Sequence, residues 1–192
     1  YLATQYGSSP GITGGFQLTQ GNRTNQNNTI GFARTAIGAY RTIVADFEFS
    51  ISLNNGPYGD GFGFLLLNTA NFGTSGPVPQ ITSEEPNVAG SIGVGFDFYA
   101  NDGESDNHLS LHYAGSRIGT FEIATSDLRL LGAFQAHASI RVDFVETGAL
   151  VNVTLHEFNG PPIRVIQNVL IPNVAAYESR VGFSGRTGNA TA

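Results

Sequence analysis

The sequence predicts an all-β protein, a two-sheet antiparallel jelly-roll sandwich, and three observations support this prediction. Charged residues make up only 12% of the chain, whereas 25 residues are Gly and 14 are Phe, a composition typical of strands joined by tight turns. Several segments alternate apolar and polar residues with the period of two that half-buried strands show. Turn residues separate these segments, and the one weak helical candidate is Ser126–Leu131.

The first half of the chain contains two clear strand signals. Residues 20–29 are rich in Asn and Thr and are expected to form a loop. Residues Ala45–Leu53 then alternate strictly, which predicts a strand with its apolar side chains on one face. A second strand is expected over Phe62–Leu67. Residues 68–90, rich in Gly, Pro, Ser and Thr, are expected to form a long loop of the kind that often carries function in a compact domain.

The second half of the chain supplies the remaining strands. The stretch Ser91–Tyr99 alternates, so its aliphatic and Phe side chains share one face, while Gly95 and Asp97 lie on the other. Further strands are expected over His108–Tyr113, in a hairpin of Ser139–Phe144 with Leu150–Leu155, over Pro162–Ile171 and over Arg180–Phe183.

Length and charge narrow the classes of function. The 192 residues are enough for one domain, and we expect a single domain over residues 1–192, either excised from a larger protein or lacking its final strand. The net charge is −6 and there is no Lys and no basic run, which argues against nucleic acid as a partner. No apolar run predicts membrane insertion. The absence of Cys excludes disulfides, thiol catalysis and cysteine-ligated zinc.

The polar segment that follows Ser91–Tyr99 carries the most chemistry. Asp97, the Tyr99 carbonyl, Asn101 and Asp106 place hard oxygen donors close together in the chain, and Ca²⁺ requires such donors. Two converging carboxylates would repel each other without a cation. The alternative is a solvated acidic turn built on the Asn-Asp-Gly sequence, and the residues alone leave both interpretations open.

A second polar feature is Asp60, which stands between Gly59 and Gly61 at a strand start. Flanking glycines allow unusual backbone geometry, and the carboxylate can accept hydrogen bonds from two sugar hydroxyls. A tight Asp-Gly turn would explain the same residues without a ligand.

Taken in order, these segments resemble the legume lectins and the wider L-type lectin group, whose fold is the concanavalin A-like sandwich. The resemblance covers the chain from about Phe16 to Gly188. It is carried by Gly59–Leu65, by Val94–Asn101 with Asp106 and His108–Leu111, by the hairpin in Ala138–Leu155, and by Arg180–Gly188, which contains Val-Gly-Phe-Ser.

The resemblance implies a set of functional residues. The calcium ligands would be Asp97, the Tyr99 carbonyl, Asn101 and Asp106. The carbohydrate-binding residues would be Asp60 through its carboxylate, Asn101 through its amide, Tyr99 through its ring, Gly76 through a backbone N–H in the Gly73–Gly76 loop, and Asn189 in the variable specificity loop. The family also has a non-proline cis peptide bond before its site Asp, here Gly59–Asp60.

Two departures from the family pattern bear on the metal content. The family's transition-metal Glu, two residues before the first Asp, is replaced by Gly95. His108 stands at the start of the next strand, where we expect it to be a strand-edge residue. We therefore expect Ca²⁺ as the one cofactor, without a second transition metal.

These observations predict a calcium-dependent, non-catalytic lectin that binds a glycan or polysaccharide, in adhesion or recognition, and is secreted or at the cell surface. One alternative is a structural or adhesive assembly module of a surface protein or filament with a vestigial sugar site. The chain ends before the family's final strand, which is compatible with a homo-oligomer or a multidomain surface protein. A glycoside hydrolase of similar fold is the weaker alternative, because its alternating Glu and Asp signature is absent.

Overall fold

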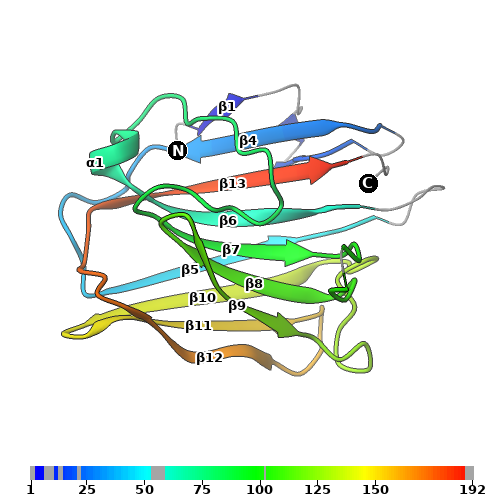
Figure 1. Cartoon of the computed structure of the whole chain (residues 1–192). Helices are drawn as coiled ribbons and strands as arrows, with labels where there is room; N and C mark the ends of the chain where they lie inside the picture. Colours follow the sequence, from blue (N-terminus) through cyan, green and yellow to red (C-terminus); the bar gives the residue numbers. More distant parts are fainter. Residues whose placement is uncertain are drawn as a thin grey trace.

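The computed structural model describes residues 3–6, 11–12, 15–20, 23–52, 59–101 and 103–188. Two antiparallel sheets pack face to face, as Figure 1 shows, which confirms the predicted all-β sandwich. The larger sheet contains, in spatial order, β1 (Ala3–Tyr6), β4 (Gln26–Phe32), β13 (Ser179–Thr187), β6 (Gly61–Asn68), β7 (Ile92–Asp97), β8 (His108–Tyr113) and β9 (Ser116–Glu122). The smaller sheet contains β12 (Ile163–Pro172), β11 (Gly148–His156), β10 (Ala136–Val145) and β5 (Thr42–Phe49). A separate short pair is formed by β2 (Gly11–Ile12) and β3 (Gly15–Phe16).

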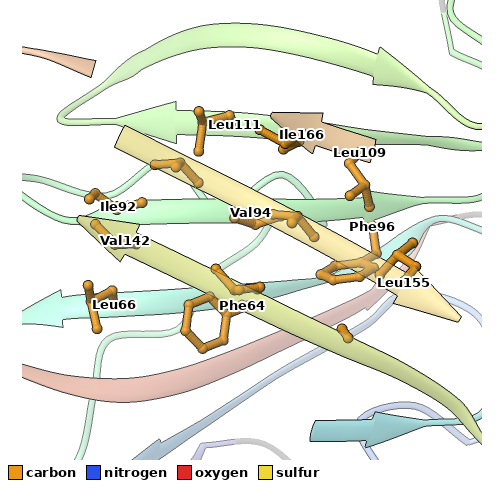
Figure 2. Packing of buried hydrophobic residues seen from close by; sticks show 14 of the residues in the cluster. Phe64, Leu66, Ile92, Val94, Phe96, Leu109, Leu111, Val142, Leu155 and Ile166 are labelled. Atoms are coloured by element: carbon orange, nitrogen blue, oxygen red, sulfur yellow. The ribbon is translucent and has the colours of Figure 1, made fainter. Parts of the chain in front are cut away.

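The core lies between the inner faces of the two sheets. Alternate residues of β6, β7 and β8 point into it, among them Phe64, Val94 and Leu109, and they meet residues of the smaller sheet such as Val142 (Figure 2). Aromatic rings are close here; those of Phe62 and Phe96 stack with centroids 4.3 Å apart. The alternation expected for Ser91–Tyr99 is confirmed, and so is the hairpin, now β10 and β11.

The prediction of a loop over residues 20–29 is wrong for its second half, because β4 begins at Gln26. The polar side chains of Asn28 and Thr29 in β4 are buried and hydrogen-bonded. The Asn28 amide donates to the Leu18 carbonyl at 2.6 Å, and the Thr29 hydroxyl accepts from the Ile81 N–H at 2.9 Å. The polar composition suggested a solvent-exposed loop. Instead, residues from other parts of the chain form hydrogen bonds to these polar groups, which allows them to be buried in the sheet.

The helical candidate Ser126–Leu131 is also wrong, since the chain there forms turns. The buried Asn107 amide holds this segment by donating to the carbonyls of Ile123 and Leu128, both at 2.8 Å. The helix that the described residues do contain is α1 (Thr69–Phe72), inside the expected long loop. No helix in the described ranges is long and apolar enough to cross a membrane.

Residues 77–90, here called the crossing segment, run over the outer face of the larger sheet. Glycines in neighbouring strands make room for its backbone. A Cβ at Gly93 would overlap the Pro86 carbonyl oxygen, and one at Gly63 would lie 2.5 Å from Pro86 Cγ. Glycine within a strand marks such a close backbone approach. Val78 and Ile81 bury apolar surface against Leu65 and Leu67 on the same face.

This contact predicts a stability effect. Gly93→Ala should destabilise the domain by about 1–3 kcal/mol, because the added methyl group must displace the Pro86 backbone. Urea denaturation measures the loss. Gly119→Ala on β9 is the control, since its Cβ would meet only the flexible Phe121 ring at 3.0 Å. Equal effects of the two substitutions would contradict the tight contact.

Candidate functional site

Asp60 lies at the start of β6 and is fixed from two sides. The Gly59–Asp60 peptide bond is cis, as expected. The Asp60 N–H donates to the Arg186 carbonyl at 3.0 Å, and the Asp60 carbonyl accepts from the Phe98 N–H at 3.2 Å. These bonds join the ends of β13 and β7 to Asp60, which is only 6% exposed.

The Asp60 carboxylate is oriented by β13. Its Oδ2 atom accepts from the Gly188 N–H at 3.0 Å and lies 3.1 Å from Arg186 Nε. A Cβ at position 188 would stand 2.7 Å from Oδ2, so a larger residue there would displace the Asp60 carboxylate. Arg186 also reaches Glu84 of the crossing segment, with Nη1 3.2 Å from Oε2. One guanidinium group therefore joins Asp60 to the crossing segment.

Two further predicted site residues lie at the same end of the sheet. The bond from Phe98 to Asp60 brings the chain after β7 beside Asp60, and Tyr99 follows directly with 39% of its surface exposed. Asn101 is half-buried, and its carbonyl accepts from the Glu104 N–H at 2.8 Å. The chain segment that carries Tyr99 and Asn101 therefore leaves β7 beside Asp60.

The carboxylate of Asp97 points into a buried polar cluster. Asp97 is 1% exposed, and its Oδ1 accepts from the Tyr99 N–H at 2.7 Å. One ligand atom from each of Glu85, Asp97, Glu104 and His108 lies within 4.8 Å of the others. Three carboxylates and an imidazole in one place can hold a divalent cation.

Burial and charge shift the protonation of this cluster. Burial raises the pKa of Asp97 to about 7, although the Tyr99 N–H and His108 oppose the rise. Burial alone would lower the pKa of His108, but its polar neighbours, Glu85 first, raise it to about 9. Burial would likewise raise the pKa of Glu85, but His108 and Arg117 are among the neighbours that hold it well below its usual range. A positive charge is therefore favoured among these carboxylates.

The structure describes the contacts of two other predicted site residues, Asp106 and Gly76. The Asp106 carboxylate is half-exposed and 3.6 Å from Arg129 Nη2, and a Glu104 carboxylate oxygen lies near Asp97. The Gly76 carbonyl accepts a hydrogen bond from the Arg180 side chain. Arg180 pairs in register with Leu67 near the far end of β6. Leu67 is roughly 20 Å along the strand from Asp60. The structure does not bring Gly76 to Asp60. Asn189 lies outside the described residues.

The structure also adds residues that the sequence interpretation missed: Glu84, Glu85, Glu104, Arg117 and Arg186. Two of them come from the crossing segment, which was predicted only as a loop. A signal was present in the alternating glycines of β6 and β7, because a strand without side chains on one face invites another backbone.

Together, the two sheets and the polar edge define the L-type lectin fold, as the resemblance implied. No protein-family model and no curated protein sequence matches the chain. Among solved structures, it is similar to peanut lectin with a 9mer peptide, with TM-score 0.66 and 19% identity over 98% of this chain and 86% of that one.

Two more solved structures show the same fold. The metal-free lectin I-B4 of Griffonia simplicifolia matches with TM-score 0.66 and 17% identity, covering 97% of this chain and 86% of that one. The exoplasmic/lumenal domain of VIP36, in its form bound to Ca²⁺ and Man3GlcNAc, matches with TM-score 0.63 and 16% identity, covering 99% and 79%.

The loop that contains Gly76 yields a prediction. Arg180 is 2% exposed, and its guanidinium group donates to the carbonyls of Phe72, Gly76 and Pro77. Arg180→Met should cost about 3 kcal/mol in unfolding free energy, because it leaves these carbonyls without their donor. The exposed Arg164→Met is the matched control in denaturant titrations. A loss below about 0.5 kcal/mol for Arg180→Met would contradict this role.

Proposed function

We propose that this domain binds carbohydrate without catalysis at the edge formed by Asp60, Tyr99 and Asn101. The observation that supports it most directly is the Asp60 carboxylate, buried yet oriented at the sheet edge. In the described part of the chain, both of its bonds fall on Oδ2, so Oδ1 is left to accept a sugar hydroxyl. The Tyr99 ring offers an apolar surface to a sugar ring.

The proposal includes calcium, and the residues present fit this ion. Asp97, the Tyr99 carbonyl and Asn101 are oxygen donors, and the buried Asp97 carboxylate needs a cation nearby. These residues would hold Ca²⁺, and Asp106 would complete the set by leaving Arg129. Bound calcium supplies a fixed positive charge. Asn101 would then present its remaining amide atom to the sugar next to Asp60.

The fold neighbours support this proposal. Peanut lectin and lectin I-B4 are lectins by name, and the VIP36 domain is described with Ca²⁺ and Man3GlcNAc bound. Hydrolysis would need two carboxylates open to a substrate, whereas Asp97 is buried and Arg117 pairs with both Glu85 and Glu104. A non-catalytic role therefore agrees better with the site. A secreted or cell-surface location and a role in adhesion belong to the same proposal.

We expect the proposed site to bind a single sugar weakly. A single monosaccharide should bind with a dissociation constant of about 1 mM, or about −4 kcal/mol. Repeated glycan units or several copies of the domain would raise the apparent affinity.

The first prediction here concerns Asp60. Asp60→Asn should lose at least about 2 kcal/mol of glycan-binding free energy, because it replaces the carboxylate acceptor at the centre of the proposed site by a weaker, neutral amide. A glycan array in Ca²⁺, followed by calorimetric titration with the best ligand, measures this. Asp46→Asn, which changes an exposed carboxylate on β5, is the control. No binding by the wild-type protein, or equal binding by both variants, would contradict the proposal.

The second prediction concerns calcium. Ca²⁺ at 100 times its dissociation constant should stabilise the folded protein by about 2.7 kcal/mol, and a chelator should reverse this. Asn101→Ala should reduce the shift in melting temperature, whereas the exposed Asn87→Ala should keep it. An unchanged melting temperature in wild-type protein with and without Ca²⁺ would rule out this role of calcium.

A further inference from the structure

Two histidine rings are stacked on the smaller sheet. His137 lies near the start of β10 and His156 at the end of β11, which run side by side (Figure 1). The two strands are antiparallel, and their register places His137 directly opposite His156. The ring centroids are 4.7 Å apart and the ring planes meet at 26°. The β10–β11 hairpin separates the two residues in the sequence, so no short spacing motif marks the pair.

Both rings lie on the outer face of this sheet, away from the core. Ala138 and Leu155, their neighbours along the two strands, are fully buried between the sheets. Successive side chains of a strand point to opposite faces, and His137 and His156 are accordingly only half-buried. Since Nε2 is at the far end of an imidazole ring, the two Nε2 atoms leave the sheet on the same side.

The hydrogen bonds of the pair leave nitrogen atoms available. His156 Nδ1 lies 3.1 Å from the Glu157 carbonyl oxygen. A carbonyl only accepts, so Nδ1 carries the proton and Nε2 presents a lone pair. His137 Nδ1 is buried and has no partner among the described residues, although buried polar atoms are normally paired. No hydrogen bond to either Nε2 atom is formed within the described part of the chain.

Carboxylates flank the two rings. Glu48 of β5 pairs in register with His137 from the other side, so Glu48, His137 and His156 form one row across three strands. Residues directly opposite each other have Cβ atoms about 4.5–5.5 Å apart. Glu48 is exposed, whereas Arg141, further along β10, is paired with Asp143. The row is therefore a place where a cation is attracted.

We propose that His137 and His156 bind one divalent late transition metal ion, Cu²⁺, Ni²⁺ or Zn²⁺, through their Nε2 atoms, beside the carboxylate of Glu48. Imidazole suits these ions, whereas Ca²⁺ and Mn²⁺ prefer oxygen. Two nitrogens bound to one ion by bonds of ~2.1 Å lie at most about 4.2 Å apart. Rings with centroids 4.7 Å apart need only a slight tilt to reach this separation.

This site is separate from the residues that would hold calcium. Asp97 belongs to β7 of the larger sheet, whereas the histidine pair lies on the outer face of the smaller sheet. The ion would join β10 to β11 and leave its other coordination positions to Glu48 or to water. The proposal goes beyond sugar binding and does not depend on it.

The test is calorimetric titration of the whole domain with Ni²⁺ or Zn²⁺, with Ca²⁺ and Mn²⁺ kept at saturation to fill oxygen-rich sites. His137→Gln and His156→Gln should each weaken one binding event at least about tenfold. Because both rings hold the same ion, the double variant should lose no more affinity than either single variant. The exposed Arg164→Gln on β12 is the control and should bind like the wild-type protein.

A readout on the wild-type protein covers the case in which the variants fail to fold. A small amount of paramagnetic Cu²⁺ should broaden the NMR signals of the His137 and His156 rings together. Broadening of one ring alone, or of neither, would overturn the proposal. Equal affinity in folded single variants, or further loss in the double variant, would do the same. Loss of glycan binding with intact metal uptake would instead contradict only the sugar proposal.

Discussion

The close contact between the crossing segment and the larger sheet is the constraint on which both polar sites depend. Gly63 and Gly93 have no side chains, and Pro86 occupies the space that their methyl groups would need, with its ring at Gly63 and its carbonyl group at Gly93. This contact fixes residues 84 and 85 above the sheet. Glu84 then reaches Arg186, and Glu85 reaches His108. Without the glycines, neither carboxylate could approach its partner.

Charge balance explains why these carboxylates are tolerated in the interior. Taking an ionised carboxylate out of water costs several kcal/mol unless an opposite charge accompanies it. Arg186 forms ion pairs with Asp60 and Glu84, and Arg117 forms ion pairs with Glu85 and Glu104. Asp97 has no arginine within the described contacts and depends on His108 or a bound cation. The polar edge is thus held by charge pairing, while the Phe-rich core holds the two sheets together.

How far the sequence predicts this structure depends on the range of each interaction. Alternation within Ser91–Tyr99 and the hairpin across residues 146–147 are local patterns, and both are confirmed. β4 was missed because its buried polar groups find partners far away in the chain, such as Ile81 for Thr29. The cis bond before Asp60 followed from a family resemblance. Glu85 was missed because only the fold brings it to His108.

Gly76 was assigned to the sugar site from the order of the loops in the sequence, and its position in the structure shows the limit of such an assignment. The resemblance placed a backbone donor in the first turn after α1, but Arg180 holds that turn at the far end of β6. The chain returns to Asp60 only eight positions later, at Glu84, which contacts it through Arg186. A carboxylate and a guanidinium group therefore occupy the side of Asp60 where a neutral N–H was expected. Since glutamate and arginine can both bond to hydroxyl groups, the crossing segment would influence the choice of sugar at the proposed site as well as stabilise the fold.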